Sequence, residues 1–125
     1  MSRIRTTAIA AAIGALLFSA TAAPVLAHAH LVRATPAVGG TVHGSPGEVT
    51  LRFNERIEPA FSAVAVRDAD GKQVDKADSQ VDKKDRTVIR VSLPPLQPGV
   101  YKVEWRAVSA DTHRVNGDFT FTVGE

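Results

Sequence analysis

Apolar residues alternate with polar ones in five short runs, and this period of two restricts the chain to β-strands. The runs cover residues 49–53, 64–66, 89–91, 101–107 and 119–123. Because side chains in a strand alternate between its two faces, each run would bury one face and expose the other. The residues from His28 onward show no helical period of useful length. The sequence therefore predicts an all-β domain.

Turn-forming residues separate these runs. Glycine, proline, asparagine and aspartate favour turns, each through its own backbone geometry or side-chain hydrogen bonding. They gather at residues 36–47, 68–71, 75–85, 93–99 and at Asn116-Gly117. With a first strand at 31–34, six or seven short strands fit into the 98 residues from His28 onward. This spacing predicts a two-sheet Greek-key β-sandwich of about seven strands.

Two aromatic residues in the longest run have predicted places in this sandwich. The segment 96–101, Leu-Gln-Pro-Gly-Val-Tyr, resembles a tyrosine corner, in which the tyrosine hydroxyl donates a hydrogen bond to the backbone of the preceding turn. We expect Tyr101 to make that bond. Trp105 continues the alternation of Tyr101 and Val103, so it is interpreted as a core residue first and as the neighbour of a site second.

The N-terminal segment has the composition of a secretory signal. Two arginines begin it, an uncharged apolar stretch follows over residues 6–23, and Pro24 breaks that stretch. The stretch is short for a membrane span, so an uncleaved anchor is the alternative interpretation. Cleavage after Ala27 leaves His28 first, and cleavage after Ala29 leaves His30 first. We expect residues 1–27 to be a cleaved signal peptide and residues 28–125 to be the exported domain.

Removal of that segment changes the composition of the working chain. The whole sequence has 15 Lys and Arg, 13 Asp and Glu, one Met and no Cys. Residues 28–125 lose two arginines and the only methionine, so they are formally neutral and contain no sulfur. The absence of thiols excludes disulfides, thiolate metal sites and thiol nucleophiles, and the neutral charge disfavours nucleic acids. A metal would be held by nitrogen and oxygen donors.

Such donors occur at the exported N-terminus and near the C-terminus. Residues two apart in an extended segment project to the same side, so the Asp111 carboxylate and the His113 imidazole would reach one ion. If His28 is first, its α-amine and imidazole Nδ1 close a six-membered chelate called a histidine brace. Three nitrogens and one oxygen suit tetragonal Cu(II), one ion per chain, whereas Zn(II) would take the same donors in a tetrahedron.

Other interpretations of these residues stay open. His30 in third place behind a free amine is itself a Cu(II)-chelating pattern, which uses two deprotonated backbone amides and would exclude Asp111 and His113. If the chain binds no metal, Asp111 and His113 would belong to a polar loop between strands, and His28 would be a disordered terminal residue. Glu55 is interpreted either as an acceptor for a ligand N–H or as a surface carboxylate. His43 is interpreted as a solvated loop residue.

At the level of motifs, the chain resembles the CopC copper-resistance proteins. The most specific stretch is 101–113 (YKVEWRAVSADTH), followed by Gly117 and 119–123 (FTFTV); 28–31 (HAHL), Thr35-Pro36 and 53–55 (FNE) support it. The resemblance implies a cupredoxin-like, Ig-like sandwich, a periplasmic copper carrier that begins at His28, and His28, Asp111 and His113 as Cu(II) ligands. It also implies a CopD-like inner-membrane copper permease as partner. Some members bind Cu(I) in a methionine-rich loop, but residues 68–85 contain no methionine, so this chain resembles a Cu(II)-only member.

The predicted function is copper capture and delivery without catalysis. Four donors fill a square plane, whereas a catalytic metal keeps an accessible position for substrate. The alternative from another class is a copper-dependent oxidase or monooxygenase, because lytic polysaccharide monooxygenases use the same brace. A metal-free sandwich module for adhesion or assembly is a third interpretation, and it predicts no spectral change when Cu(II) is added.

Overall fold

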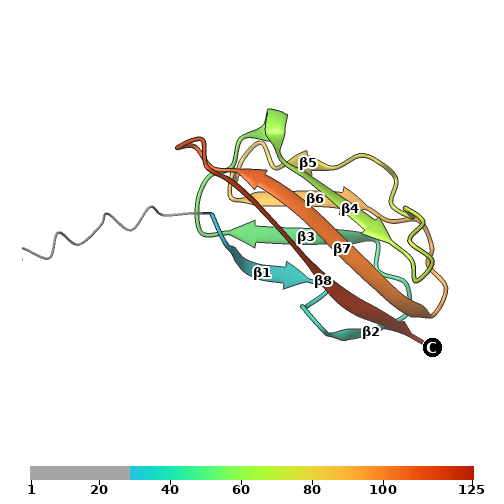
Figure 1. The fold of residues 1–125 in the computed structure, drawn as a ribbon. Helices are drawn as coiled ribbons and strands as arrows, with labels where there is room; N and C mark the ends of the chain where they lie inside the picture. Colours follow the sequence, from blue (N-terminus) through green and yellow to red (C-terminus); the bar gives the residue numbers. More distant parts are fainter. Residues whose placement is uncertain (1–28) are drawn as a thin grey trace, which may run out of the picture.

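Two four-stranded sheets face each other in the computed structural model, which describes residues 29–125 (Figure 1). Eight strands and one short 3-10 helix follow one another as β1 (Leu31–Thr35), β2 (Thr41–His43), β3 (Glu48–Phe53), η1 (Pro59–Phe61), β4 (Ala63–Arg67), β5 (Gln80–Val81), β6 (Val88–Ser92), β7 (Gly99–Val108) and β8 (Arg114–Gly124). No helix in this part of the chain is long and apolar enough to cross a bilayer. The predicted signal peptide, residues 1–27, lies outside the described residues, as does His28.

The strand order confirms the predicted two-sheet sandwich. One sheet has the order β1-β3-β6-β5 and the other β2-β8-β7-β4. All neighbours are antiparallel except β2, which runs parallel to the end of β8. The long hairpin of β7 and β8 pairs ten residues of each strand, from Gly99 opposite Val123 to Val108 opposite Arg114. Its closing loop therefore lies at one end of the sandwich.

The core consists of the alternate residues that the sequence pattern selects. Inward-facing side chains from both sheets are buried between them: Val49, Leu51, Phe53, Val64, Val66, Ile89, Val91, Tyr101, Val103, Ala107, Phe119, Phe121 and Val123. Burying this apolar surface is the main favourable contribution to folding. The alternation prediction is confirmed for all five runs.

The tyrosine corner is also present. The Tyr101 hydroxyl donates a hydrogen bond of 2.6 Å to the backbone oxygen of Gln97, in the turn that precedes β7. The Tyr101 ring stacks on Phe121, with centroids 5.7 Å apart and an interplanar angle of 22°. The residue thus ties the 93–98 connection to the core.

The predicted turn at Asn116-Gly117 is wrong, because both residues lie inside β8. Gly117 pairs with Trp105 of β7, and a Cβ atom built on Gly117 would meet Trp105 Cζ2 at 2.5 Å. Glycine here makes room for the indole ring rather than for a turn. The indole is half-buried and meets the Phe53 ring edge to face at 5.0 Å, so the interpretation of Trp105 as a core residue holds.

Two further strands lie where the sequence predicted turns alone. The segment 36–47 contains β2 and the segment 75–85 contains β5. Each is only two or three residues long, which is too short to show alternation, and each is an edge strand held by pairing with a longer neighbour. Periodicity cannot detect elements of this length.

Candidate metal centre

The five-residue loop between β7 and β8 brings Asp111 and His113 together. The Oδ2 atom of Asp111 lies 3.0 Å from Nδ1 of His113. Their side chains are 44% and 36% exposed, so both are open to solvent while being held by the loop. A carboxylate and an imidazole at this separation can serve one ion.

The geometry that produces this pair differs from the predicted one. The loop is a turn and not an extended segment: Thr112 has φ of 70°, and its N–H donates to the Ser109 oxygen at 2.9 Å. The Ser109 N–H closes the loop by donating to the His113 oxygen at 3.0 Å. A β-branched residue in the left-handed region is rare, and such strained positions concentrate at functional sites.

Ser109 holds the loop in place from its buried side. It is fully buried, and its hydroxyl donates a hydrogen bond to Oδ1 of Asp111. That bond is the main reason why the pKa of Asp111 is lowered from its ordinary value; partial desolvation opposes it, and the contacts with His113 add to it. The Asp111 carboxylate is therefore kept ionised and fixed in orientation.

The start of β1 is anchored at the same end of the sandwich. Ala29 is 2% exposed and belongs to the core cluster. The next residue, His30, has both backbone groups bonded to Asn54: its N–H donates to Asn54 Oδ1 at 2.7 Å, and its oxygen accepts from the Asn54 N–H at 3.1 Å. The His30 side chain is exposed. His28, the predicted first ligand, directly precedes this anchored point in the sequence.

One segment, residues 54–58, links the two places. At its beginning Asn54 holds His30. Further along, the Ala110 N–H donates to the Arg56 oxygen at 3.1 Å, Ile57 forms a bridge with Ser109, and the Glu58 N–H donates to the Val108 oxygen at 2.7 Å. Figure 1 shows the start of β1 and the β7–β8 loop at the same end of the molecule.

The other candidate residues lie as follows. Glu55 is half-buried in the bend of segment 54–58. His43 is exposed as predicted, but it lies in β2 rather than in a loop, with Nδ1 3.4 Å from the Glu125 oxygen. Because β2 pairs with the end of β8 and the loop precedes its start, His43 is remote from Asp111 and His113. Within residues 29–125, no three His, Asp or Glu side chains gather as a metal site.

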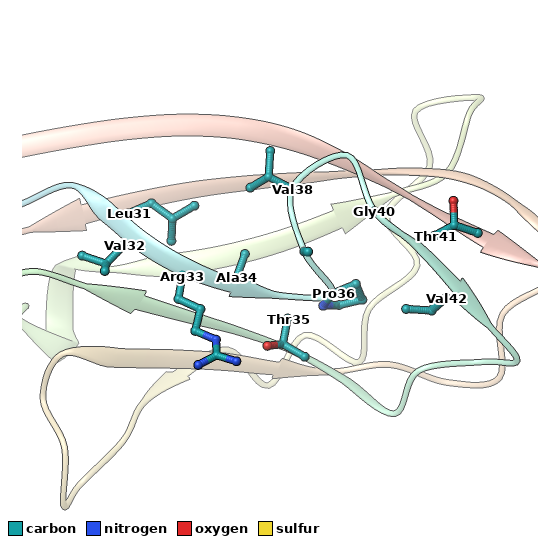
Figure 2. Close-up of a pocket in the computed structure, with 11 residues that line it drawn as sticks. Leu31, Val32, Arg33, Ala34, Thr35, Pro36, Val38, Gly40, Thr41 and Val42 are labelled. Carbon is teal, nitrogen blue, oxygen red and sulfur yellow. The ribbon is translucent and has the colours of Figure 1, made fainter.

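A cleft of about 540 Å³ lies beside β1 and its connection to β2 (Figure 2). Leu31, Arg33, Ala34, Thr35 and Val38 are among the residues that line it, and Arg33 points to the opposite side of β1 from Ala34. No imidazole or carboxylate lines this cleft. It is therefore not a candidate for holding a metal.

The sequence interpretation missed two residues of the site, Asn54 and Ser109. Ser109 carried a signal, because it continues the inward alternation of β7 through residues 101, 103, 105 and 107 as a polar residue. Asn54 lies within the 53–55 segment that supports the family resemblance, but no local pattern indicated that it would hold His30.

Together, the two-sheet sandwich and the imidazole–carboxylate loop at its end define a small β-domain with a candidate site at its surface, and comparisons with known proteins show the family to which it belongs. The CopC domain family matches residues 31–124. The chain belongs to the CopC family of copper-resistance proteins.

Relatives with solved structures share the fold. CopC from Methylosinus trichosporium OB3b is 35% identical, with a TM-score of 0.69 over 77% of this chain and 93% of that one. PcoC from Escherichia coli, described as a methionine-rich copper resistance protein, is 30% identical, with a TM-score of 0.69 over 78% of this chain and all of that one.

Curated relatives are named for copper resistance or copper transport. Copper resistance protein C of Pseudomonas syringae pv. tomato is 37% identical over 103 residues, covering 78% of this chain and 81% of that protein. The copper transport protein CutJ of Bacillus subtilis (strain 168) is 34% identical over 100 residues, which is 79% of this chain but 18% of that protein. In CutJ, a region similar to this chain is thus a small part of a much longer protein.

Proposed function

We propose that this protein is a periplasmic copper carrier that binds one Cu(II) ion through a histidine brace at His28 together with Asp111 and His113. It would bind the ion tightly and buffer it or deliver it to a membrane partner. Copper is the cargo of this site, and no chemical step is required of it.

The observation that carries the proposal is the double attachment of segment 54–58. Its first residue, Asn54, holds His30, and its end pairs with the loop that carries Asp111 and His113. Ala29 is fixed in the core next to this segment. A terminal amine and imidazole placed one residue before Ala29 would therefore start from the end of the sandwich where the other two donors lie.

The donor chemistry supports Cu(II). Amine, imidazole and carboxylate are the nitrogen and oxygen ligands of tetragonal Cu(II), whereas Cu(I) prefers thioether and thiolate. PcoC is described as methionine-rich, but this chain has its only methionine at position 1. In the segment 68–85, carboxylates accept backbone N–H groups instead: Asp82 from Lys84 and Asp85, and Asp68 from Asp70 and Lys72. This supports a Cu(II)-only carrier.

The surface around the loop supports a carrier rather than an oxidase. A polysaccharide oxidase needs a flat face with aromatic side chains, yet Phe53, Tyr101, Phe119 and Phe121 are buried and Trp105 is packed against the core. Phe61 is the exposed aromatic residue among those that the structure describes. An assay of peroxide-driven polysaccharide turnover tests the oxidase directly, and we expect no product.

The proposed partner is a membrane copper transporter of the CopD type. CutJ supports this proposal, because a protein named for copper transport contains a similar region within a much longer chain. In the present protein, the same kind of domain would act after export and deliver its ion to such a transporter.

The test is Cu(II) titration of the chain that begins at His28, followed by electron paramagnetic resonance and by quenching of Trp105 fluorescence. We expect one Cu(II) per chain with nitrogen-rich tetragonal coupling. His113→Ala should weaken binding by more than about 100-fold, since even outer partners of a metal site contribute 10- to 100-fold. His43→Ala is the matched control and should bind as the natural chain does. Equal binding by both variants would reject the proposed site.

A further inference from the structure

The exported terminus His-Ala-His contains two competing copper sites, and the structure bears on which of them forms. In the brace, the amine and imidazole of His28 bind the ion with Asp111 and His113. In the rival mode, the amine, the backbone nitrogens of Ala29 and His30 and the His30 imidazole form a square plane by themselves. Both modes start from the same amine, so one molecule cannot use both for one ion.

The backbone nitrogen of His30 is already engaged. Its N–H donates a 2.7 Å hydrogen bond to Asn54 Oδ1, and the His30 oxygen accepts from the Asn54 N–H at 3.1 Å. In the rival mode this nitrogen is itself a ligand and carries no hydrogen, so it cannot donate to Asn54. The bond and the rival mode therefore exclude each other.

The position of Ala29 adds a second obstacle to the rival mode. Its side chain is buried in the core cluster, and the strand that follows pairs Leu31 with Phe53. To wrap residues 28–30 around one ion in a plane, the chain would have to withdraw Ala29 from the core. Asn54 maintains this arrangement, because it immediately follows Phe53 and forms hydrogen bonds to His30, the residue before Leu31.

We propose that Asn54 is a positioning residue that selects the brace over the rival site by holding both backbone groups of His30. This inference rests on the proposed function and deepens it: it assigns to an uncharged side chain, which is not itself a ligand, the choice between two coordination modes. Without the Asn54 side chain, the ratio of the two modes shifts toward the rival by about tenfold, which corresponds to the loss of one strong hydrogen bond to a backbone amide.

Ni(II) is a useful probe because it accepts tetragonal nitrogen and oxygen donors, and only the two deprotonated amides of the rival mode exert a field strong enough to make it diamagnetic and yellow. The chain that begins at His28 should give little of the yellow, diamagnetic Ni(II) species. Asn54→Ala should raise the amount of that species about tenfold at equal Ni(II), and should add a Cu(II) absorption band at shorter wavelength from the stronger amide donors. Adding His30→Ala to Asn54→Ala should abolish both new signals.

Two matched variants show whether the lost acceptor is the cause. Asn54→Asp keeps an oxygen at the same position and should behave as the natural chain does. Asn116→Ala removes an exposed asparagine of β8 that pairs with Arg106 of β7 and not with β1, and should also change nothing. A further readout needs no metal: the His30 amide hydrogen should exchange slowly in the natural chain and faster in Asn54→Ala.

The inference is overturned if the natural chain forms the square-planar Ni(II) species as readily as Asn54→Ala, or if the His30 amide exchanges at the same rate in both. Its failure is distinguishable from failure of the proposed function. If His113→Ala weakens Cu(II) binding while Asn54→Ala leaves the binding mode unchanged, the brace stands and only the role of Asn54 falls. If His113→Ala has no effect on the natural chain, the proposed function fails first.

Discussion

Asp111 and His113 face each other across 3.0 Å because Ser109, fully buried beneath them, fixes the turn that joins them. The serine hydroxyl bonds to the Asp111 carboxylate, and the serine N–H bonds to the His113 backbone oxygen. A residue that contacts no metal in the proposed site thus sets the geometry of two of its ligands.

Ser109→Ala should lower Cu(II) affinity by about 10- to 100-fold, because outer partners orient metal ligands. Loss of the hydroxyl also raises the pKa of Asp111 toward its ordinary value. Ser62→Ala is the matched control: Ser62 is also buried and its hydroxyl accepts from the Val108 N–H, but it has no bond to Asp111. Competition titration against a chelator measures the affinities. An equal loss in both variants would show that the effect is on stability alone.

The apparent Cu(II) affinity should fall as the pH drops from neutral into the mildly acidic range. The two imidazoles and the amine must be neutral to bind, so protons displace the ion. Asp111 does not limit retention in this range, because its pKa is lowered from 3.8 and it stays ionised. The measurement is the apparent Cu(II) affinity, by competition with a chelator, at several pH values in this range. An affinity that does not change with pH there would contradict ligation by imidazole and amine.

Acid should also destabilise the metal-free fold through aspartates outside the loop. The pKa of Asp78 is lowered chiefly by a side-chain hydrogen bond from Ser92. The pKa of Asp82 is lowered chiefly by the backbone N–H groups of Asp85 and Lys84, and that of Asp85 chiefly by the Thr87 side chain. Their folded pKa values lie below the unfolded value of 3.8, so the unfolded state binds more protons in that window. Their stabilisation is therefore complete above pH 3.8 and is lost as the pH falls through the folded values. Urea unfolding against pH should show this decline, and Asp82→Asn should make it shallower.

Gly117→Ala should destabilise the fold by about 1–3 kcal/mol, the usual cost of forcing extra volume into a packed site. The new Cβ would lie 2.5 Å from Trp105 Cζ2, so the indole must move away from Phe53. Thermal unfolding and the Trp105 emission maximum report the change. Gly47→Ala is the control, since nothing lies within 4 Å of its added Cβ. Unchanged stability in Gly117→Ala would mean that Trp105 does not pack as described.

Tyr101→Phe should cost about 1 kcal/mol, since it removes one hydrogen bond and leaves the stacking on Phe121 in place. Urea unfolding measures the loss. Cu(II) affinity should not change, because the corner lies at the start of β7 and the loop that carries Asp111 and His113 lies at its end. A change in affinity would show that the two ends of the hairpin are coupled.

The sequence predicted the strands that have enough residues to alternate, and it missed those that do not. Runs such as 101–107 give a clear period, whereas β2 and β5 exist only because longer strands offer them a pairing edge. Asn116-Gly117 has the composition of a turn, yet Trp105 across the hairpin requires its glycine. In each of these cases the structure depends on contacts between residues far apart in the sequence, and a local sequence pattern does not reveal such contacts.

The candidate site shows the same division. The spacing of Asp111 and His113 predicted that they meet, but the route is a turn through a left-handed Thr112 and not an extended strand. Asn54 and Ser109 act through partners 24 residues and two residues away, respectively. Ser109 carried a signal in the strand pattern, whereas no local pattern pairs Asn54 with His30, 24 residues away.

The central claim is that a free amine at His28 is a copper ligand, and one added residue tests it. Cu(II) affinity and the electron paramagnetic resonance spectrum should be compared between the chain that begins at His28 and the same chain with one glycine placed before it. The added glycine should remove most of the affinity and the three-nitrogen coupling, because the six-membered chelate of His28 can no longer close. Equal affinity and an unchanged spectrum in the extended chain would contradict the brace.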